Sequence, residues 1–460
     1  MSAAASPCTA APMLDILRTP LLTDLYELTM YDAYLEAGMV GPASFEFFVR
    51  KLPPCRNFLL ACGLAQVVEF VLGARFGEAE LAWLEGCGRF SPRTIARLAR
   101  FRFTGDVDAV PEGTVVFAHE PILRVTAPLP EAQLLETRLV NLLHFQTLIA
   151  SKAARMVLAA GEGKMLLDFG LRRAHGAEAG VLAARASYIA GFAGSATVPA
   201  EPLFGIPVYG TMAHSFVQAH EDEIQAFLHF ARARPQSLVL LIDTYDTERA
   251  AQRVVELAPK LAAEGIPLRG VRIDSGDLAE HARKVRRILD EGGLREVRIF
   301  ASGGIDEQLI ARHVAEGVPI DGWGVGTSLT TSNDWASLDC AYKLVDYAGK
   351  PRRKRSEGKA TLPARKQVFR RFDRSGRMVA DTIALESERL AGEPLLVPVI
   401  RGGELVSPLP SLARIRERVQ AQYRSLPEPL KGLEPAHDYP VDISQGLSRL
   451  VQSLDQAGDP

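Results

Sequence analysis

The sequence predicts an α/β protein in which an irregular βα barrel is joined to a second, α+β domain built from N-terminal and C-terminal segments. Short apolar runs alternate with amphipathic helical segments in the middle of the chain, and this alternation is typical of parallel βα units with right-handed crossovers. The segments on either side lack that alternation and combine helical and extended patterns. The length of 460 residues is sufficient for a large core and a second domain.

The composition indicates a globular protein without a strong overall charge. Apolar residues make up 47% of the chain and charged residues 23%, the net charge is −2 and the pI is about 6.5. No global field therefore favours nucleic acid or an anionic membrane, and an anionic substrate needs a local basic site.

The cysteines and the N-terminal residues indicate the cytoplasm. The five cysteines form no CxxC pair, and none lies beside a histidine at metal-ligand spacing, so free thiols in a reducing compartment are expected. Residues 1–16 are expected to be a flexible tail without the features of a signal peptide. The most apolar stretch, residues 59–74, is interrupted by Gln66 and Glu69 at helical spacing, which predicts a buried helix face instead of a membrane span.

The α+β domain is expected over residues 17–150, completed by about 345–400. Its N-terminal part contains a helical pattern, an extended segment, short apolar runs broken by Gly and Pro, and a long helical period. These predict, in order, a helix at Leu17–Gly38, a strand at Phe45–Arg50, a small antiparallel sheet at Phe101–Val125 and a helix at Glu131–Val157.

The barrel is expected over residues 151–344. Its strands are predicted at Lys164–Phe169, Pro207–Gly210, Leu238–Ile242, Gly270–Ile273, Val297–Ala301 and Gly322–Val325. Helices are predicted at Thr247–Ala263, where Pro259 should cause a bend, Leu278–Asp290 and Asp306–Ala315. A doubly wound sheet is the alternative, and the barrel is preferred because phosphate signals lie at the ends of successive strands.

The last part of the chain is less regular. It is basic through Lys350–Lys366 and strand-like after that. Residues 401–460 are expected to be a C-terminal extension with Pro-rich turns, a helix at Ser411–Tyr423 and a frayed end.

Two loops rich in glycine follow the last two barrel strands. Ser302, Gly303 and Gly304 lie in the first loop, and Gly326 and Thr327 lie in the second. Small residues let backbone N–H groups approach an anion, and the loops after the last two strands of βα barrels often hold a phosphate. The alternative is a pair of tight turns without a ligand.

Charged residues follow other barrel strands. Arg172 and Arg173 come after the strand that ends at Asp168, and guanidinium groups suit a phosphate or a carboxylate. Arg272 and Asp274 share one face of their strand and are functional candidates. The alternative for Asp274 is to cap the following helix, as Ser275 and Asp277 could also do, and Asp277 is the expected cap.

His214 also follows a predicted strand, near the mouth where these segments converge, and a histidine there can act as acid, base or phosphate acceptor. Asp243 ends another strand, where it either reaches magnesium or only caps the next helix. His220 and His229 are expected on the surface, and the absence of an HExxH pair argues against zinc.

These segments together resemble the nicotinate phosphoribosyltransferases, a family of type II phosphoribosyltransferases. The resemblance extends from Thr23 to about Leu385, and its motifs occur in the family's order. They are Thr23–Met30, Asp168–Arg173, Gly210–Phe216, Leu241–Asp246, Gly270–Leu278, Gly324–Leu329, Tyr342–Val345 and Lys354–Lys366.

The resemblance implies roles for the pocket residues. His214 matches the histidine that ATP phosphorylates. Asp274, a candidate from its place on the strand, is expected to be catalytic with it. Thr211 and Arg272 match positions around the pyridine ring and its carboxylate, and Phe169 would stack on the ring. Where many bacterial members have Glu-Trp after the histidine, this chain has Ser215-Phe216, which leaves the strictness of ATP coupling open.

The remaining roles concern phosphates and the partner subunit. Arg172 would meet a phosphate or pyrophosphate, and the 5′-phosphate would bind at Ser302, Gly303, Gly304, Gly326 and Thr327. Tyr26, with Asp24 beside it, would enter the pocket of the neighbouring subunit, which implies a homodimer with shared active sites.

The activity that the resemblance implies is the formation of nicotinate mononucleotide and pyrophosphate from nicotinic acid and phosphoribosyl pyrophosphate, in the salvage route of NAD biosynthesis. ATP would be a co-substrate and Mg²⁺ or Mn²⁺ the metal. The alternatives are an enzyme for nicotinamide or quinolinate on the same scaffold, a catalytically silent regulatory relative, and an unrelated phosphate-binding barrel such as an aldolase.

Overall fold

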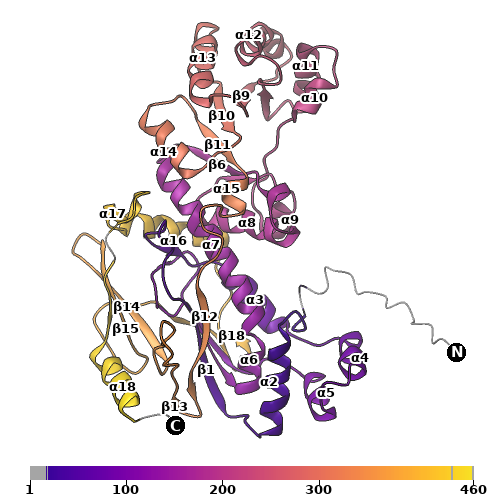
Figure 1. Cartoon of the computed structure of the whole chain (residues 1–460). Coiled ribbons are helices and arrows are strands. Elements are labelled where there is room, and N and C mark those ends of the chain that lie inside the picture. Colours follow the sequence, from indigo (N-terminus) through magenta and orange to yellow (C-terminus); the bar gives the residue numbers. More distant parts are fainter. Residues whose placement is uncertain (1–16, 18, 437–438, 458–460) are drawn as a thin grey trace, which may run out of the picture.

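The computed structural model describes residues 17, 19–436 and 439–457. Figure 1 shows an elongated molecule in which a parallel sheet and its helices form the upper body and two mostly antiparallel sheets lie in the lower body. The predicted N-terminal tail, residues 1–16, lies outside the described residues. Among the described helices, none combines the length and apolarity that a membrane crossing requires.

A seven-stranded antiparallel sheet forms the centre of the α+β domain. Its strand order is β13-β12-β1-β5-β3-β17-β18. The strands are β1 (Pro42–Val49), β3 (Asp106–Ala109), β5 (Leu123–Pro128), β12 (Cys340–Tyr347), β13 (Lys350–Pro351), β17 (Val397–Arg401) and β18 (Glu404–Leu405). Strands from both ends of the chain therefore share one sheet, as the predicted fold class requires.

The helices of this domain differ from the prediction mainly at their boundaries. The helix predicted from Leu17 begins at Leu25, because residues 19–23 form turns around Pro20, which has no backbone N–H to donate. Around it lie α2 (Leu25–Glu36), α3 (Leu64–Gly73), α4 (Glu78–Gly86) and α5 (Pro92–Leu98), with the short pair β2 (Leu59–Leu60) and β4 (Val115–Val116).

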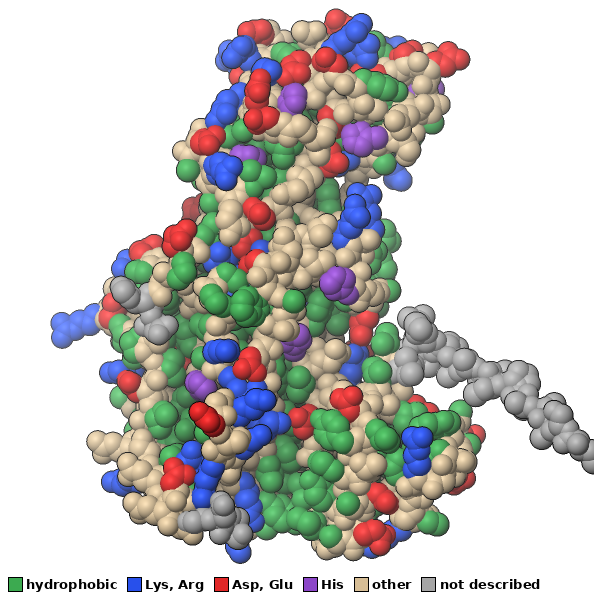
Figure 2. All heavy atoms as spheres, in the orientation of Figure 1, with side chains coloured by type: hydrophobic (Ala, Val, Ile, Leu, Met, Phe, Trp, Pro, Cys, Tyr) green, Lys and Arg blue, Asp and Glu red, His purple; other side chains and the backbone are tan. Residues whose placement is uncertain are grey.

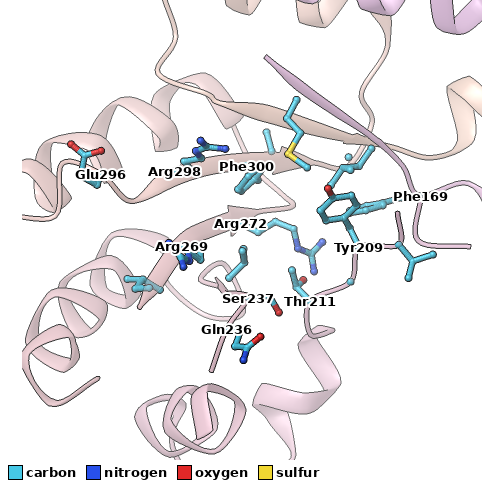
Figure 3. A pocket seen from close by; sticks show the side chains of 18 residues that line it. Phe169, Tyr209, Thr211, Gln236, Ser237, Arg269, Arg272, Glu296, Arg298 and Phe300 are labelled. Atoms are coloured by element: carbon cyan, nitrogen blue, oxygen red, sulfur yellow. The ribbon is translucent and has the colours of Figure 1, made fainter. Parts of the chain in front are cut away.

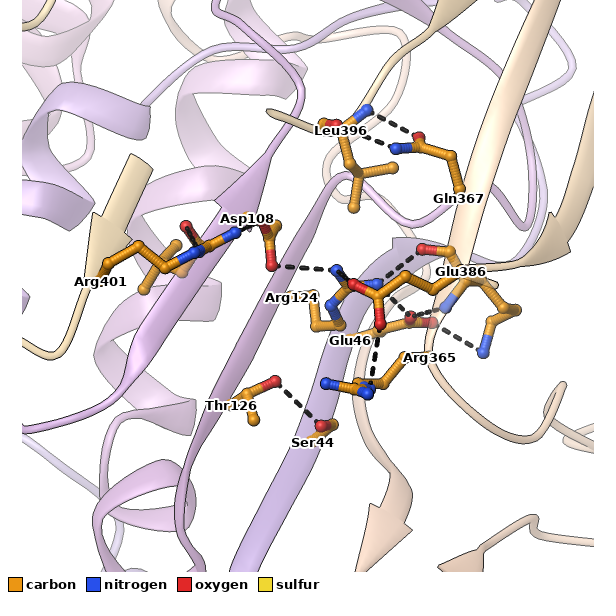
Figure 4. A network of polar contacts seen from close by, with 12 residues as sticks. Ser44, Glu46, Asp108, Arg124, Thr126, Arg365, Gln367, Glu386, Leu396 and Arg401 are labelled. Carbon is orange, nitrogen blue, oxygen red and sulfur yellow. Dashed lines mark hydrogen bonds and ion pairs between the residues drawn. The ribbon is translucent and has the colours of Figure 1, made fainter. Parts of the chain in front are cut away.

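A buried network of charges ties the later strands to this sheet (Figure 4). Arg124 on β5 donates to Asp108 at 2.9 Å, to Glu386 at 2.6 Å and to the carbonyl of Lys366 at 2.7 Å. Lys366 itself lies 2.7 Å from Glu46 on β1, and burial lowers the pKa of its ammonium group. Since a buried charge is costly without a partner, these pairs fix the position of the C-terminal segment.

The long helix predicted at Glu131–Val157 is divided into α6 (Leu129–Leu134) and α7 (Glu136–Ala160). With a rise of about 1.5 Å per residue, the 25 residues of α7 extend over roughly 37 Å. Figure 1 shows α7 running from the lower body into the upper body, so that one rigid element joins the two.

The upper body is an open half-barrel, which confirms the predicted irregular βα architecture. Its six parallel strands have the order β7-β6-β11-β10-β9-β8. They are β6 (Met165–Asp168), β7 (Gly194–Ser195), β8 (Leu238–Leu241), β9 (Leu268–Ile273), β10 (Arg298–Ser302) and β11 (Gly322–Val325). No described pairing joins β8 to β7, so one side of the sheet remains open.

The strand predicted at Pro207–Gly210 is wrong. Only Val208 pairs there, through an isolated bridge to Ser195, because Pro207 lacks a donor and the segment is too short to continue a ladder. The neighbouring strand β7 was not predicted.

Helices connect the strands of the half-barrel in βα alternation. They are η1 (Leu171–Arg173), α8 (Ala177–Ala190), α9 (Ala200–Phe204), α10 (His214–Gln218), α11 (Glu223–Ala233), α12 (Thr247–Ala263), α13 (Leu278–Glu291), α14 (Glu307–Ala315) and α15 (Thr327–Thr330). The apolar side of each long helix packs on the sheet, as the buried positions Ala250, Val254, Leu257 and Leu261 of α12 illustrate. α12 continues through Pro259.

The C-terminal segment forms a third unit with a four-stranded sheet in the order β16-β14-β15-β19. Its elements are β14 (Lys366–Phe372), β15 (Met378–Leu385), β16 (Glu393–Pro394), α16 (Leu412–Ser425), α17 (Glu428–Lys431), β19 (Val441–Ile443) and α18 (Gln445–Gln456). The sequence predicted a frayed end, and this prediction is wrong for the described residues up to 457. They form the helix α18, which Ser444 caps and Leu447 anchors by its burial.

The predicted helix in the extension, α16, contacts the other two units. Arg416 donates to the carbonyls of Tyr188 and Phe192 at the end of α8, and Gln422 accepts from the backbone N–H of Val115 at 3.0 Å. The extension therefore holds the half-barrel against the lower body.

Candidate functional site

A cavity of about 700 Å³ lies on the concave face of the half-barrel (Figure 3). Apolar side chains from β6, β8 and β10 line its walls, including Leu167, Val239 and Phe300. Phe169, Thr211 and Arg272 lie at its carboxyl-terminal end, where the sequence placed the pocket. An apolar cavity with a few convergent polar groups is the usual form of a small-molecule site.

Phe169 is held by the turn that follows β6. Asp168 is fully buried and accepts from the N–H of Gly170 at 2.8 Å and from Ser195 Oγ at 2.6 Å. Burial raises the pKa of Asp168, and these hydrogen bonds offset only part of that effect. A Cβ on Gly324 would lie 2.4 Å from the Phe169 ring, so only glycine lets the ring pack on β11.

Arg272 brings a charged fork into the cavity. It donates to the carbonyl of Met212 at 2.7 Å and to Ser302 Oγ at 3.1 Å, and it lies 3.2 Å from an oxygen of Asp274. Burial lowers its pKa, although the carboxylates of Asp274 and Asp243 act in the opposite direction. The Nε of Arg272 is buried and has no hydrogen-bond partner within the described chain, so one donor remains for a ligand.

His214, the first residue of α10, stands at the mouth of the cavity. Its Nδ1 lies 3.2 Å from Thr244 Oγ, and its Nε2 lies 3.8 Å from Asp274 Oδ2. Its side chain is 38% exposed, so the imidazole is not enclosed by the protein. The imidazole is thus held on one side and accessible on the other.

Asp243 and Asp274 form the acidic side of the mouth. One oxygen of Asp243 accepts from the N–H of Asp274 at 2.8 Å and from Ser275 Oγ at 2.6 Å. Its other oxygen, Oδ1, is buried and has no hydrogen-bond partner in the described residues. Asp277 caps α13 by accepting from the N–H of Glu280, as predicted.

The two glycine-rich loops lie next to this mouth. Gly303 has φ +86°, and a Cβ there would lie 2.1 Å from the carbonyl oxygen of Asp274, so no other residue fits. Gly326 precedes α15, which begins at Thr327. Ser328 Oγ donates to the carbonyl of Ile305, so the two loops are linked directly.

Of the predicted residues, Phe169, Thr211 and Arg272 line this cavity, and the histidine, the acidic residues and the glycine-rich loops lie beside it. Arg172, Asp24 and Tyr26 are placed differently. Arg172 lies in the exposed turn η1, although its charge also contributes to lowering the pKa of Arg272. Asp24 and Tyr26 lie at the start of α2 in the other domain, where Asp24 accepts from Thr137 Oγ at 3.0 Å and Tyr26 is 44% exposed.

The sequence reasoning missed several residues of the site. Tyr209, Arg269 and Arg298 line the cavity, and Asp168 and Thr244 position site residues. For Arg298 a signal existed, because strand alternation places it on the same face as Phe300. Asp168 contacts Ser195 and Thr244 contacts His214, and both contacts join segments that are distant in sequence. A local sequence pattern therefore does not predict them.

Comparison with protein families gives three successive matches along the chain. They are the N-terminal domain of nicotinate phosphoribosyltransferase over residues 21–144, the nicotinate phosphoribosyltransferase family over 165–356 and its C-terminal domain over 389–451.

Individual proteins agree with these matches. Nicotinate phosphoribosyltransferase pncB2 of Mycobacterium tuberculosis is 49% identical over 429 residues, covering 93% of this chain and 92% of the relative. Nicotinate phosphoribosyltransferase of Bacillus subtilis is 36% identical over 456 residues, covering 92% and 93% of the two chains. The crystal structure of human nicotinic acid phosphoribosyltransferase aligns with a TM-score of 0.84 at 32% identity, covering 94% of this chain and 100% of that one.

Proposed function

The chain belongs to the nicotinate phosphoribosyltransferase family, and on that premise we propose how its site performs the reaction of this enzyme in NAD biosynthesis. The reaction joins nicotinate to the ribose 5-phosphate of phosphoribosyl pyrophosphate and releases pyrophosphate. Phe169, Arg272 and the two glycine-rich loops lie together at one end of the half-barrel, and this arrangement is the main support for the proposed roles.

Nicotinate, an aromatic carboxylate, suits the cavity end. The Phe169 ring offers a face for stacking on the pyridine, with Thr211 beside it. The guanidinium of Arg272 is charged, fixed by three neighbours and has a free Nε–H, so it suits the carboxylate. This orientation would direct the ring nitrogen toward the mouth.

The phosphate loops place the second substrate. Ser302, Gly303, Gly304, Gly326 and Thr327 would bind the 5′-phosphate through N–H and hydroxyl groups. The pyridine nitrogen forms its bond to the anomeric carbon as the bond to pyrophosphate breaks, through an oxocarbenium-like state. Arg172, exposed near the mouth, would meet the leaving pyrophosphate.

Mg²⁺ or Mn²⁺ fits the same mouth. The buried and unpartnered Oδ1 of Asp243 is a carboxylate oxygen of the kind that hard cations bind. The described residues contain no group of three or more His, Cys, Asp or Glu placed to hold a metal, so substrate phosphates would supply further ligands. When bound, the metal would neutralise charge on the pyrophosphate.

His214 is the proposed phosphoryl acceptor from ATP. With the proton on Nδ1 donated to Thr244 Oγ, Nε2 keeps its lone pair, and the partly exposed side chain leaves it open to a phosphoryl donor. The P–N bond would form there as the bond between the γ-phosphorus and the bridging oxygen breaks and ADP leaves. Asp274, 3.8 Å away, would stabilise the positively charged imidazole in the transition state.

We also propose a homodimer with shared sites in the cytoplasm. Tyr26 and Asp24 lie on an exposed part of α2, away from the cavity of their own chain, which suits a contribution to the partner's site. The four described cysteines are free thiols, as expected in a reducing compartment. The dimer is tested by mixing a Tyr26→Ala chain with an Arg272→Met chain. Shared sites predict recovery to about one quarter of wild-type activity, because half of random dimers are mixed and each has one intact site. No recovery after subunit exchange would contradict sharing.

The reaction is tested by product formation from nicotinate and phosphoribosyl pyrophosphate with Mg²⁺, with and without ATP, and with nicotinamide as a parallel substrate. Nicotinate mononucleotide formed faster with ATP supports both the substrate and the role of His214. Preference for nicotinamide would overturn the substrate.

A further inference from the structure

A group of five charged side chains lies buried beneath the two glycine-rich loops and takes no part in the reaction described above. We call it the buried cluster: Arg56, Lys152, Arg155, Glu307 and Asp334. Lys152 and Glu307 are fully buried, and Arg56 and Arg155 nearly so. Charges in such a position need partners, and here every one has them.

Lys152, on α7, lies at the centre of the buried cluster. Its Nζ is 2.7 Å from Glu307 Oε2 and 3.0 Å from Asp334 Oδ1. Lys152 and Glu307 form an ion pair, but the angle at the contact does not meet that of a hydrogen bond, and Glu307 Oε2 has no hydrogen-bond partner among the described residues. Lys152 is therefore a bridge between two carboxylates that have no direct contact with one another among the described interactions.

Each carboxylate lies on the segment that follows one of the two loops. Glu307 begins α14, three residues after Gly304, and Asp334 follows α15, seven residues after Thr327. Each carboxylate also has its own arginine, since Arg155 Nε lies 3.0 Å from Glu307 and Arg56 lies 2.6 Å from Asp334. Figure 1 shows the upper part of α7 beside α14, and α15 also packs on α7.

The charges do not balance. Three cations face two carboxylates, so the buried cluster carries one net positive charge close to the loops. Burial acts to raise the pKa of Asp334, but the hydrogen bond and charge of Arg56, with Lys152, hold it well below its usual range. The carboxylate therefore stays ionised at neutral pH, and the excess positive charge persists.

We propose that Lys152 is a positioning residue for the phosphoribosyl pyrophosphate site: by pairing with Glu307 and Asp334 at once, it fixes the spacing of the two loops that bind the 5′-phosphate. This proposal rests on the proposed function. Backbone N–H donors bind an anion only at a defined separation, and a displacement of about 1 Å in such a site can cost on the order of a hundredfold in rate. The bridge acts on that separation from below, in addition to the hydrogen bond from Ser328 to Ile305, and does not touch the substrate.

Arg155 provides a matched control. Lys152→Met and Arg155→Met remove the same charge, but of these two residues only Lys152 contacts both carboxylates, whereas Arg155 contacts Glu307 and the carbonyl of Leu433. The proposal predicts that Lys152→Met raises KM for phosphoribosyl pyrophosphate about tenfold or more, and Arg155→Met less than about threefold. KM for nicotinate should change little in either variant.

Binding of ribose 5-phosphate, measured by calorimetry without turnover, gives a readout that separates this proposal from the proposed function. If the wild-type chain binds ribose 5-phosphate and Lys152→Met binds it at least about tenfold more weakly, the bridge is supported. If both variants weaken binding equally, net charge and not bridging is responsible, and the proposal is overturned. Absence of binding by the wild-type chain would instead count against the 5′-phosphate site itself.

A loss of folding is excluded by thermal unfolding of both variants. Should Lys152→Met not fold, Glu307→Gln keeps the size of the side chain and breaks one arm of the bridge, and the same weakening of ribose 5-phosphate binding is expected. Lower unfolding temperatures with unchanged binding and unchanged KM in all variants would reduce the buried cluster to a purely structural role and overturn the proposal.

Discussion

Replacing Arg272 by methionine tests whether its guanidinium recognises the carboxylate of nicotinate. Methionine keeps much of the length and apolar contact of arginine but removes the charged fork that contacts Met212, Ser302 and Asp274. A hydrogen bond to a charged group contributes about 1.5–3 kcal/mol, and about 1.4 kcal/mol corresponds to a factor of ten. The expected loss in kcat/KM for nicotinate is therefore about 10- to 100-fold.

Nicotinamide makes the result specific, because it has the same ring without the negative charge. The assay compares kcat/KM for both substrates at saturating phosphoribosyl pyrophosphate. The ratio of nicotinate to nicotinamide should fall by most of the loss seen with nicotinate. Arg272→Lys keeps the charge without the fork and should lie between the two. Equal losses on both substrates with Arg272→Met would refute carboxylate recognition by this side chain.

Further measurements address the other parts of the site. His214→Ala should abolish the stimulation of the rate by ATP while leaving slow synthesis, and an unchanged dependence on ATP would exclude phosphoryl transfer to this residue. Gly303→Ala should raise KM for phosphoribosyl pyrophosphate and lower the unfolding temperature, because its Cβ would meet the Asp274 carbonyl at 2.1 Å; Gly304→Ala, with open space around its Cβ, should cost only about 1–2 kcal/mol for its positive φ. Burial raises the pKa of Glu27 to about 7, so the folded chain holds a proton that the unfolded chain releases, and stability falls as the pH rises from about 4.5 to 7. The free energy of unfolding of Glu27→Gln, relative to that of the wild type, should therefore rise by about 3 kcal/mol between pH 4 and pH 8 in denaturant titrations. A difference that does not change with pH would contradict the raised pKa.

The sequence was informative where a residue's role follows from its place in a βα unit. The apolar run that precedes Asp243 and the segment that contains Arg272 mark strands, and the carboxyl ends of parallel strands meet at one edge. This regularity was sufficient to bring Phe169 and Arg272 together, whereas His214 was placed after a segment that is not a strand. The same logic failed at Pro207–Gly210, where proline removes a donor that a strand needs.

Other features depend on contacts that local patterns do not encode. Lys152 has the sequence appearance of any lysine on an amphipathic helix, yet it is fully buried between two carboxylates from the loops. The basic stretch Lys350–Lys366 is a second example, because its composition reveals a positive charge but not the residues that it contacts. Figure 2 shows Lys and Arg side chains gathered over the middle of the lower body, on the face drawn there. The composition of such a surface does not identify the molecule that binds to it.

The site residues are held by one another, and this determines where a ligand gains binding energy. Arg272 is fixed by three neighbours, and Asp243 holds the backbone of Asp274, so little ordering remains to oppose binding. Among the buried polar atoms that have no partner in the described chain are Nε of Arg272 and Oδ1 of Asp243. An unsatisfied buried polar group costs about 1–3 kcal/mol, and a ligand that supplies the missing partner recovers that cost. One atom is a donor that fits a carboxylate and the other an acceptor that fits a cation on pyrophosphate, so the protein's own unmet hydrogen bonds favour the two substrates of the proposed reaction together.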